Sequence, residues 1–391
     1  MKILNVTGCE LYQESIVKAE GCYIIDNNGK KYLDFEAGVW ALPLGHNNPR
    51  VNNAIIKQLG EISHTAYRYT HPVVEEAAAR LLHALELDTG KCVFLSSGSE
   101  AVEFGIKVAN KVSGKPYLLN LEKHYLSAYG VGGSMKAAPW ISIDWQSWEK
   151  EQQDNFDSLL SDIPFDKISA FVFEPGNASG NVLLPPKELI HAITAKVKEH
   201  GGLLVVDEVT TGMGRTGAWF GYQNFGLHPD IVACGKGLGN GYPVSAVGIS
   251  SEVCELLENT DFAYGQSHQN DPLGAAAAKE VLAVMDEENL LKESIVKGRY
   301  LLEQLVGLKE KYNCVKAVRG IGLMCAIEFD DSFGTERLTD LHKQLFDAGF
   351  LVGLRLATKI MRFYPPLIVE EAMIKDMVMA LDQILETEII D

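Results

Sequence analysis

The sequence predicts an α/β fold with a mainly parallel central sheet, helices on both faces of that sheet, and a smaller α+β unit. Three observations support this prediction. Short apolar segments alternate with helical segments from about residue 50 onward. These short segments are apolar throughout, as strands buried on both faces should be. From about residue 300 to residue 391 helices mix with short strands, which indicates a separate unit.

The elements follow in chain order. Two short strands are expected within residues 21–35, on either side of Asn27-Asn28-Gly29, a sequence typical of tight turns. The alternating region then has predicted helices at 73–87, 100–110 and 187–200. Its predicted strands are 92–95, 117–121, 170–173, 203–206 and 231–234. A long helical stretch begins at residue 271, and further strands are expected at 322–329 and 360–364.

Length, composition and charge indicate a folded protein of two domains. Of 391 residues, 47% are hydrophobic and 22% are charged, which excludes wholesale disorder. We expect an N-terminal segment (1–45) that joins the small domain, a large domain (46–290) and a C-terminal small domain (291–391). The formal net charge of -17 argues against a nucleic-acid-binding protein, because such a protein needs a basic surface.

The cysteines and the N-terminal residues bear on the compartment. Seven cysteines are present, no Cys-x-x-C occurs, and no Cys/His spacing matches a zinc site. The sequence turns polar after its first four residues, and no apolar run reaches the roughly 18 residues of a membrane span. We therefore expect a cytoplasmic protein with reduced thiols, no metal and no membrane contact.

Chemically useful side chains follow four of the predicted strands. In chain order these loops are Ser96-Ser97-Gly98-Ser99-Glu100, Glu174-Pro175, Asp207-Glu208-Val209 and Gly235-Lys236-Gly237. Because ligands of open α/β sheets bind beyond the carboxyl ends of the strands, we expect the four loops to face one cleft. That cleft would offer a cradle for an anion, two carboxylates and one lysine.

Each of these residues also has a simpler interpretation. Gly98 and Ser99 lie where the free N–H groups of a helix start bind an anion, but serine is also a common helix cap. Asp207 can bind a metal or pair with a cation, or it can cap the following loop. Lys236 can attack a carbonyl if its pKa is lowered by burial and cationic neighbours, although most single lysines are simply solvated.

Two longer runs, DEVTTGMGRTG (207–217) and GKGLGNGYPVSA (235–246), resemble those of the class III aminotransferases. The resemblance covers almost the whole chain, through segments at 21–35, 44–51, 94–110, 173–175, 318–329 and 361–367. It implies a fold type I enzyme similar to the ornithine, acetylornithine and 4-aminobutyrate aminotransferases. Such an enzyme uses pyridoxal 5'-phosphate to move an amino group from an amino acid or ω-amino compound to a keto acid.

The resemblance also implies roles for individual residues. Lys236 would be the Schiff-base lysine, which holds the cofactor in an internal aldimine and then moves a proton between Cα and C4′. Asp207 would keep the pyridine nitrogen protonated. Further cofactor contacts would come from Gly98, Ser99, Tyr125, Glu174, Val209, Thr210 and Ser267. Gly98 and Ser99 would bind the phosphate, and Val209 would pack on one face of the ring.

Three of these positions depart from the family pattern. Tyr125 falls where an aromatic residue stacks on the other ring face, but the family's following His and Gly are missing. His124 is an alternative for this stacking role, and an exposed loop aromatic is the simpler interpretation of Tyr125. Thr210 stands where many members carry Gln. Ser267 replaces a threonine that the neighbouring subunit contributes to the phosphate, which implies a homodimer, or a higher oligomer, with shared active sites.

Two residues are expected to bind the substrate. Arg362 occupies the place of the family arginine that binds the α-carboxylate in a two-pronged pair, with a structural ion pair as the alternative. Trp40 lies in a region that lines the pocket, with core packing as the alternative. Ser179 stands where a Glu often holds a mobile arginine, so ordinary glutamate or ornithine specificity is not implied. The tryptophan-rich segment 140–148 has no family counterpart.

The motifs leave several reactions open. The resemblance favours transamination. A racemase, an epimerase or an aminomutase would use the same lysine on the same scaffold, and a decarboxylase is a weaker alternative. A regulator that only binds the cofactor is disfavoured, because Lys236 is present and the chain has no basic patch.

Overall fold

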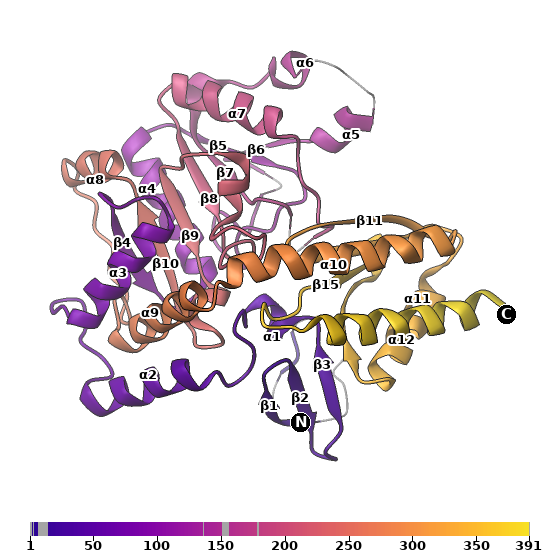
Figure 1. Cartoon of the computed structure of the whole chain (residues 1–391). Helices are drawn as coiled ribbons and strands as arrows, with labels where there is room; N and C mark the ends of the chain where they lie inside the picture. The colour runs from indigo at the N-terminus through magenta and orange to yellow at the C-terminus, as the bar shows by residue number, and fades with distance from the viewer. Residues whose placement is uncertain are drawn as a thin grey trace.

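The computed structural model describes residues 2, 4–6, 15–135, 137–150, 156–177 and 180–390, and its largest sheet has seven strands (Figure 1). The strand order is β4-β10-β9-β8-β7-β5-β6. These strands are β4 (Lys91–Leu95), β5 (Tyr117–Leu121), β6 (Trp140–Ile143), β7 (Ile168–Phe173), β8 (Leu203–Asp207), β9 (Ile231–Cys234) and β10 (Ser245–Ile249). Strand β10 runs in the opposite direction to the other six strands, so the predicted mainly parallel sheet is confirmed.

Helices cover both faces of this sheet. One face packs against α4 (Gly98–Ser113) and α8 (Ser251–Glu258). The other packs against α3 (Pro72–Ala84), α7 (Lys187–Glu199) and α9 (Pro272–Glu287), with α2 (Pro49–Glu61) against α9. Along β8, Leu204 and Val206 belong to one core and Val205 to the other. This division explains why the strands are apolar throughout.

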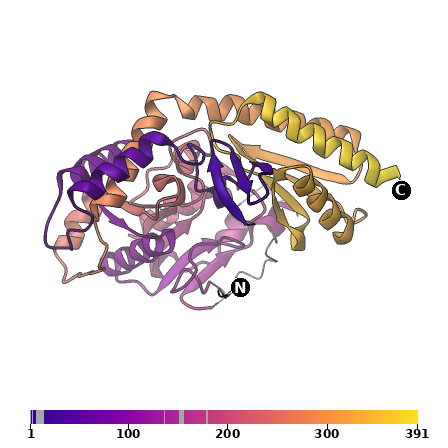
Figure 2. The same ribbon diagram turned by 90° about the horizontal axis from the view of Figure 1, so that it is seen from below.

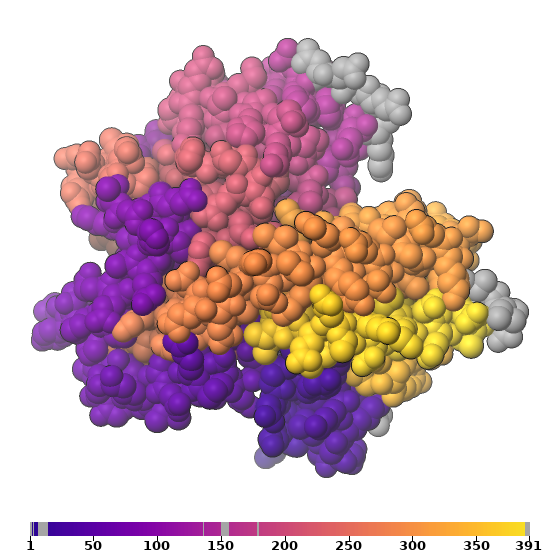
Figure 3. Space-filling view, viewed as in Figure 1, coloured from indigo at the N-terminus to yellow at the C-terminus, as the bar shows by residue number. Residues whose placement is uncertain are grey.

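The C-terminal part forms a smaller α+β unit, as predicted. Its antiparallel sheet has the order β11-β12-β15-β14. The strands are β11 (Val315–Ile321), β12 (Met324–Phe329), β14 (Gly353–Arg355) and β15 (Ile360–Phe363). The helices are α10 (Leu290–Lys311), α11 (Thr335–Asp347) and α12 (Glu371–Ile390). Figure 3 shows α10 and α12 side by side across one face of the molecule.

The N-terminal strands form a third sheet with a strand from the C-terminal unit. Strands β1 (Ile16–Glu20), β2 (Tyr23–Asp26) and β3 (Lys31–Asp34) are antiparallel, and β3 pairs in parallel with β13 (Phe350–Leu351). Figure 2 shows the chain from below, with these strands near its middle. The pairing supports the idea that the N-terminal segment joins the small domain, although the boundaries 1–45, 46–290 and 291–391 stay a prediction.

The local elements agree with the sequence where turn residues and apolar runs are clear. In the hairpin, Asp26 Oδ1 accepts hydrogen bonds from the N–H groups of Asn28 and Lys30, each at 2.9 Å, and Gly29 has a φ of 83°. The strands that were not predicted are β1, β6, β10, β11, β13 and β14. Within the described residues, no helix is both long and apolar enough to cross a membrane.

The tryptophans of the segment 140–148 contribute to packing within the large domain. Trp140 lies in the edge strand β6, where its indole N–H donates a hydrogen bond to the Val131 carbonyl at 2.7 Å. Trp145 is buried in the core, and the ring of Trp148 packs on Phe156 at 4.8 Å between centroids. These contacts explain all three tryptophans by packing, and none of them requires a role in a substrate pocket.

Candidate active site

The loops after β4, β8 and β9 meet at the carboxyl edge of the large sheet, as predicted. A Cβ atom added to Gly98 would lie 2.5 Å from Cγ1 of Val209. A Cβ added to Gly235 would lie 3.3 Å from the Cα of Gly98. Only glycine at these two positions allows the three segments to approach this closely. The approach brings the start of α4 next to the segments that carry Asp207 and Lys236.

The start of α4 has the geometry of an anion site. Ser97 caps the helix by accepting a hydrogen bond from the N–H of Glu100, whose carboxylate accepts from the N–H groups of Ser96 and Ser97. The N–H groups of Gly98 and Ser99 belong to the first turn, so they have no helix carbonyl to bond. The Ser99 hydroxyl accepts a hydrogen bond from the N–H of Ala128 at 3.0 Å, which holds it beside this turn.

Replacing Gly98 with alanine tests this cradle. The added methyl would force Val209 or the helix start to move, and overpacking typically costs about 1–3 kcal/mol. We expect the apoenzyme to bind pyridoxal phosphate roughly tenfold more weakly, measured by fluorescence titration. Gly307→Ala is the matched control, because that helical glycine has no atom within 4 Å of an added Cβ. Equal affinity in both variants would contradict the cradle.

Two buried carboxylates lie beside the cradle. Asp207 ends β8, and its Oδ1 accepts a hydrogen bond from the Val209 N–H at 2.9 Å. Burial raises the pKa of Asp207, and the negative charge of Glu174 raises it further. Glu174 is also buried and accepts a long hydrogen bond, 3.4 Å, from the N–H of Tyr125. A cationic group placed against Asp207 would therefore be strongly stabilised.

Lys236 follows β9 and faces these carboxylates. Its Nζ donates a hydrogen bond to Oγ1 of Thr210 at 2.8 Å and lies 4.6 Å from the centroid of the Trp40 ring. Burial lowers the pKa of Lys236, the positive charge of Arg362 adds to this, and the two carboxylates oppose it. Burial therefore favours the neutral, nucleophilic amine.

Arg362 lies close to Lys236, because both side chains contact the ring of Trp40. Cζ of Arg362, on β15, lies 4.9 Å from the Trp40 ring centroid, so one indole contacts both cations. The indole also packs against the ring of Tyr364, edge-on at 5.5 Å between centroids. Trp40 ends a left-handed turn in which residues 37–40 have φ values of 47°, 58°, 62° and 68°. Backbone strain of this kind is concentrated at functional sites.

Glu36 is a site residue that the sequence did not single out. A Cβ added to Gly353 would lie 2.9 Å from Oε1 of Glu36 and 3.3 Å from Nε of Arg362, so both groups border one glycine. Burial raises the pKa of Glu36, and the guanidinium of Arg362 opposes this rise. The available signal was an acidic residue between the apolar Phe35 and Ala37.

Arg215 is a second residue that was missed. Its side chain is buried, and its guanidinium donates hydrogen bonds to the carbonyls of Leu323 and Pro365. These bonds tie the segment after Asp207 to the C-terminal unit, next to the strand that carries Arg362. Burial lowers the pKa of Arg215 to about 10.

The remaining predicted residues have different surroundings. Tyr125 is 53% exposed, whereas its alternative His124 is buried 6.2 Å from the ring of Phe173, and burial lowers the pKa of His124 to about 3. Ser267 is exposed on the loop before α9. Ser179 lies outside the described residues. The roles of Tyr125 and Ser267 therefore stay predictions.

Comparisons with known proteins agree with this geometry. The family model "Aminotransferase class-III" matches residues 9–126 and 131–385. An acetylornithine aminotransferase from Methanocaldococcus jannaschii is 33% identical over 387 residues, covering 94% of this chain and 92% of the relative. An S-selective transaminase from Arthrobacter sp. is 25% identical, with a TM-score of 0.90, and the match covers 99% of this chain and 96% of that structure. An amine transaminase from an uncultivated Pseudomonas species, solved with PLP bound, is 26% identical, with a TM-score of 0.88 and 99% coverage of both chains.

Proposed function

Because this chain belongs to the class III aminotransferases, it is a pyridoxal-phosphate-dependent transaminase, and we propose that its amino donor is an amino acid whose carboxylate binds Arg362. The observation that carries this proposal is the shared contact of Lys236 and Arg362 with one ring, that of Trp40. A donor held by its carboxylate at Arg362 would present its amino group beside Nζ of Lys236.

The residues at the site fit pyridoxal phosphate. The first turn of α4 offers Gly98 and Ser99 to a phosphate. The buried carboxylate of Asp207 suits a protonated pyridine nitrogen, because that positive charge would oppose the rise in pKa that burial causes. Lys236 offers an amine to the aldehyde, and Val209 offers an apolar contact to the ring. When bound, the cofactor supplies an aldehyde that combines with amines and a ring that withdraws electrons from Cα.

Lys236 is the group we assign to the proton transfer. Desolvation favours its neutral amine, which can accept a proton from Cα of the donor. The hydroxyl of Thr210, 2.8 Å away, orients Nζ in the structure. The carboxylates of Asp207 and Glu174 stabilise the ammonium that forms, so the same lysine could return the proton to C4′ of the bound cofactor.

Arg362 and Glu36 together would set the choice of donor. The relatives differ in what their names say they act on: one is an acetylornithine aminotransferase and one is an amine transaminase. Glu36 attracts Arg362 electrostatically and would hold it when no carboxylate is bound. A donor carboxylate would then compete with Glu36 for the guanidinium. The indole of Trp40 would form the wall of the space between Arg362 and Lys236.

Replacing Arg362 with glutamine tests the proposed donor class. Charge-assisted hydrogen bonds contribute about 1.5–3 kcal/mol, so we expect KM for carboxylate-bearing donors to rise roughly 10- to 100-fold. The rate with simple amines such as 1-phenylethylamine should change little. Initial rates over a panel of amino acids and amines, with pyruvate or 2-oxoglutarate as acceptor, measure this difference.

Glu36→Gln is the matched control for that experiment. It removes the internal competitor for Arg362, so KM for carboxylate donors should fall while KM for amines stays unchanged. If Arg362→Gln lowers activity equally with amino acids and amines, Arg362 has a structural role, and the proposed donor class is wrong.

We also propose a cytoplasmic homodimer. Tyr67 and Tyr69 are 64% and 72% exposed, and large exposed aromatics favour an interface with another protein surface. Ser267 is exposed on the loop before α9, so its hydroxyl is accessible to the phosphate site of a second subunit. The six described cysteines are free, which supports a reducing compartment.

A further inference from the structure

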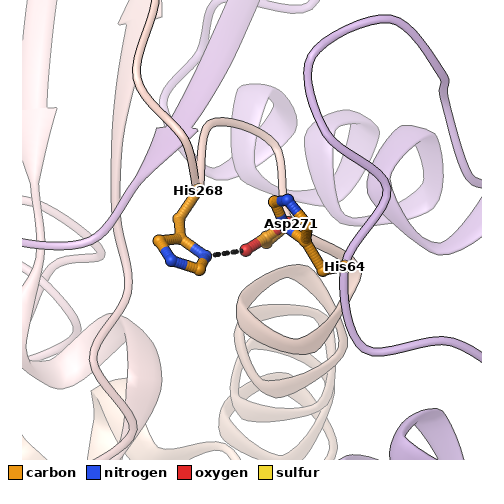
Figure 4. A group of neighbouring side chains, drawn as sticks. All are labelled: His64, His268 and Asp271. Carbon is orange, nitrogen blue, oxygen red and sulfur yellow. Dashed lines mark hydrogen bonds and ion pairs between the residues drawn. The ribbon is translucent and has the colours of Figure 1, made fainter.

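Two histidines and one aspartate from distant parts of the chain meet before α9 (Figure 4). Nδ1 of His64, in the segment between α2 and α3, lies 2.6 Å from Oδ1 of Asp271. Nδ1 of His268 lies 2.5 Å from Oδ2 of the same carboxylate. Figure 4 shows both imidazoles directed toward Asp271 from separate loops. We propose that these three residues form a binding site for a divalent transition-metal ion such as Zn²⁺.

The ligand set and its spacing support this proposal. The candidate ligand atoms of the three residues lie within 4.8 Å of one another. Zinc bonds to histidine nitrogen and carboxylate oxygen are about 2.0–2.2 Å, so small side-chain rotations would bring the three atoms around one ion. Two imidazoles and a carboxylate suit zinc better than magnesium or calcium, which prefer oxygen ligands. Within a single chain the imidazoles are 43% and 65% exposed, so water or a group of a partner subunit would complete the coordination.

The carboxylate of Asp271 is directed toward the two histidines and does not cap the helix that follows it. Asp271 is the N-cap residue of α9, a position where an aspartate normally accepts a hydrogen bond from the first helical turn. Here its side chain makes no capping hydrogen bond, and each oxygen faces one histidine. The backbone beneath it is fixed, because Asn270 exchanges two hydrogen bonds with Phe94 of β4, at 2.8 and 2.9 Å.

The site is also connected to the anion cradle. The N–H of His268 donates a hydrogen bond to the side chain of Gln266. Nε2 of Gln266 donates in turn to Oε1 of Glu100, at 3.1 Å, within the cap of α4. An ion bound by His268 would therefore fix the loop that touches the cradle. The inference does not depend on the proposed donor, since metal binding is measured directly.

The test is isothermal titration of the metal-free holoenzyme with ZnCl2. We expect one ion per chain, and a rise in the melting temperature with Zn²⁺ concentration. His268→Gln and His64→Gln should each weaken binding at least tenfold, because each removes a ligand. His83→Gln is the matched control: His83 contacts a single carboxylate, that of Asp88 at 2.9 Å, and its loss should leave binding unchanged.

Two results would overturn the proposal. One is no heat and no thermal shift with the unchanged protein up to millimolar ZnCl2. The other is binding that persists with the same affinity in the His64→Gln, His268→Gln double variant, which would place the ion on other groups such as thiols. A circular dichroism spectrum of the double variant, matching that of the parent, establishes that any loss of binding reflects the ligands.

Discussion

Replacing Lys236 with alanine should reduce turnover by at least about 10⁴-fold, the upper range for a general acid–base group. No other described amine has this position: Nζ is buried, bonded to Thr210 and placed over Trp40. Alanine cannot hold the cofactor covalently or carry a proton at Cα. Steady-state rates and the visible absorption of the purified protein would both report the loss.

The matched control for that variant is Lys91→Ala. Lys91 is an exposed lysine paired with Glu258, and exposed pairs contribute little to stability. Its removal should leave rate and spectrum unchanged. Turnover in Lys236→Ala within tenfold of the parent would show that another group moves the proton, and the assignment of Lys236 would be wrong.

Asp207→Asn should slow the reaction by about 10²- to 10³-fold while the cofactor still binds. This range is typical for the loss of one electrostatic contact to developing charge in a buried site. The amide keeps the shape of the side chain, but it has no negative charge to stabilise a protonated ring nitrogen. Single-turnover kinetics with saturating cofactor separate this effect from weaker binding.

Glu208→Gln provides the contrast, because it changes the adjacent buried carboxylate. Oxygens of Glu208 accept hydrogen bonds from the Thr211 hydroxyl at 2.7 Å and from the N–H groups of Gly221 and Tyr222 at 2.8 and 2.7 Å. Its loss should lower the free energy of unfolding by about 1–3 kcal/mol with little change in rate. If the two variants lost rate equally, Asp207 would have no special role.

The sequence predicts the fold and the loops at the centre of the site well, for a physical reason. The strands before Gly98, Asp207 and Lys236 are buried on both faces, so they are unbroken apolar runs that end where the polar chemistry begins. Parallel connectivity then places the loops at one edge. Strand β10 was missed because it is antiparallel and its first two residues, Ser245 and Ala246, belong to the run already read as a motif.

Pairings between distant segments were not predictable in the same way. Glu36 meets Arg362 only because β15 and the turn after β3 fold against each other through Gly353. The left-handed turn that positions Trp40 contains Val39, a residue type that disfavours this conformation, so propensity points away from it. His64 and Asp271 are joined by tertiary packing alone, and their sequence spacing matches no metal motif.

The measurement that tests the central claim most directly is a single turnover without an acceptor. Holoenzyme is mixed in deuterated water with one amino acid at a time, in the absence of any keto acid, and products are quantified by mass spectrometry and NMR. A transaminase will release one equivalent of keto product per chain with the active donor and then stop. Deuterium exchange and loss of stereochemistry at Cα, with no keto product from any amino acid, would contradict the account.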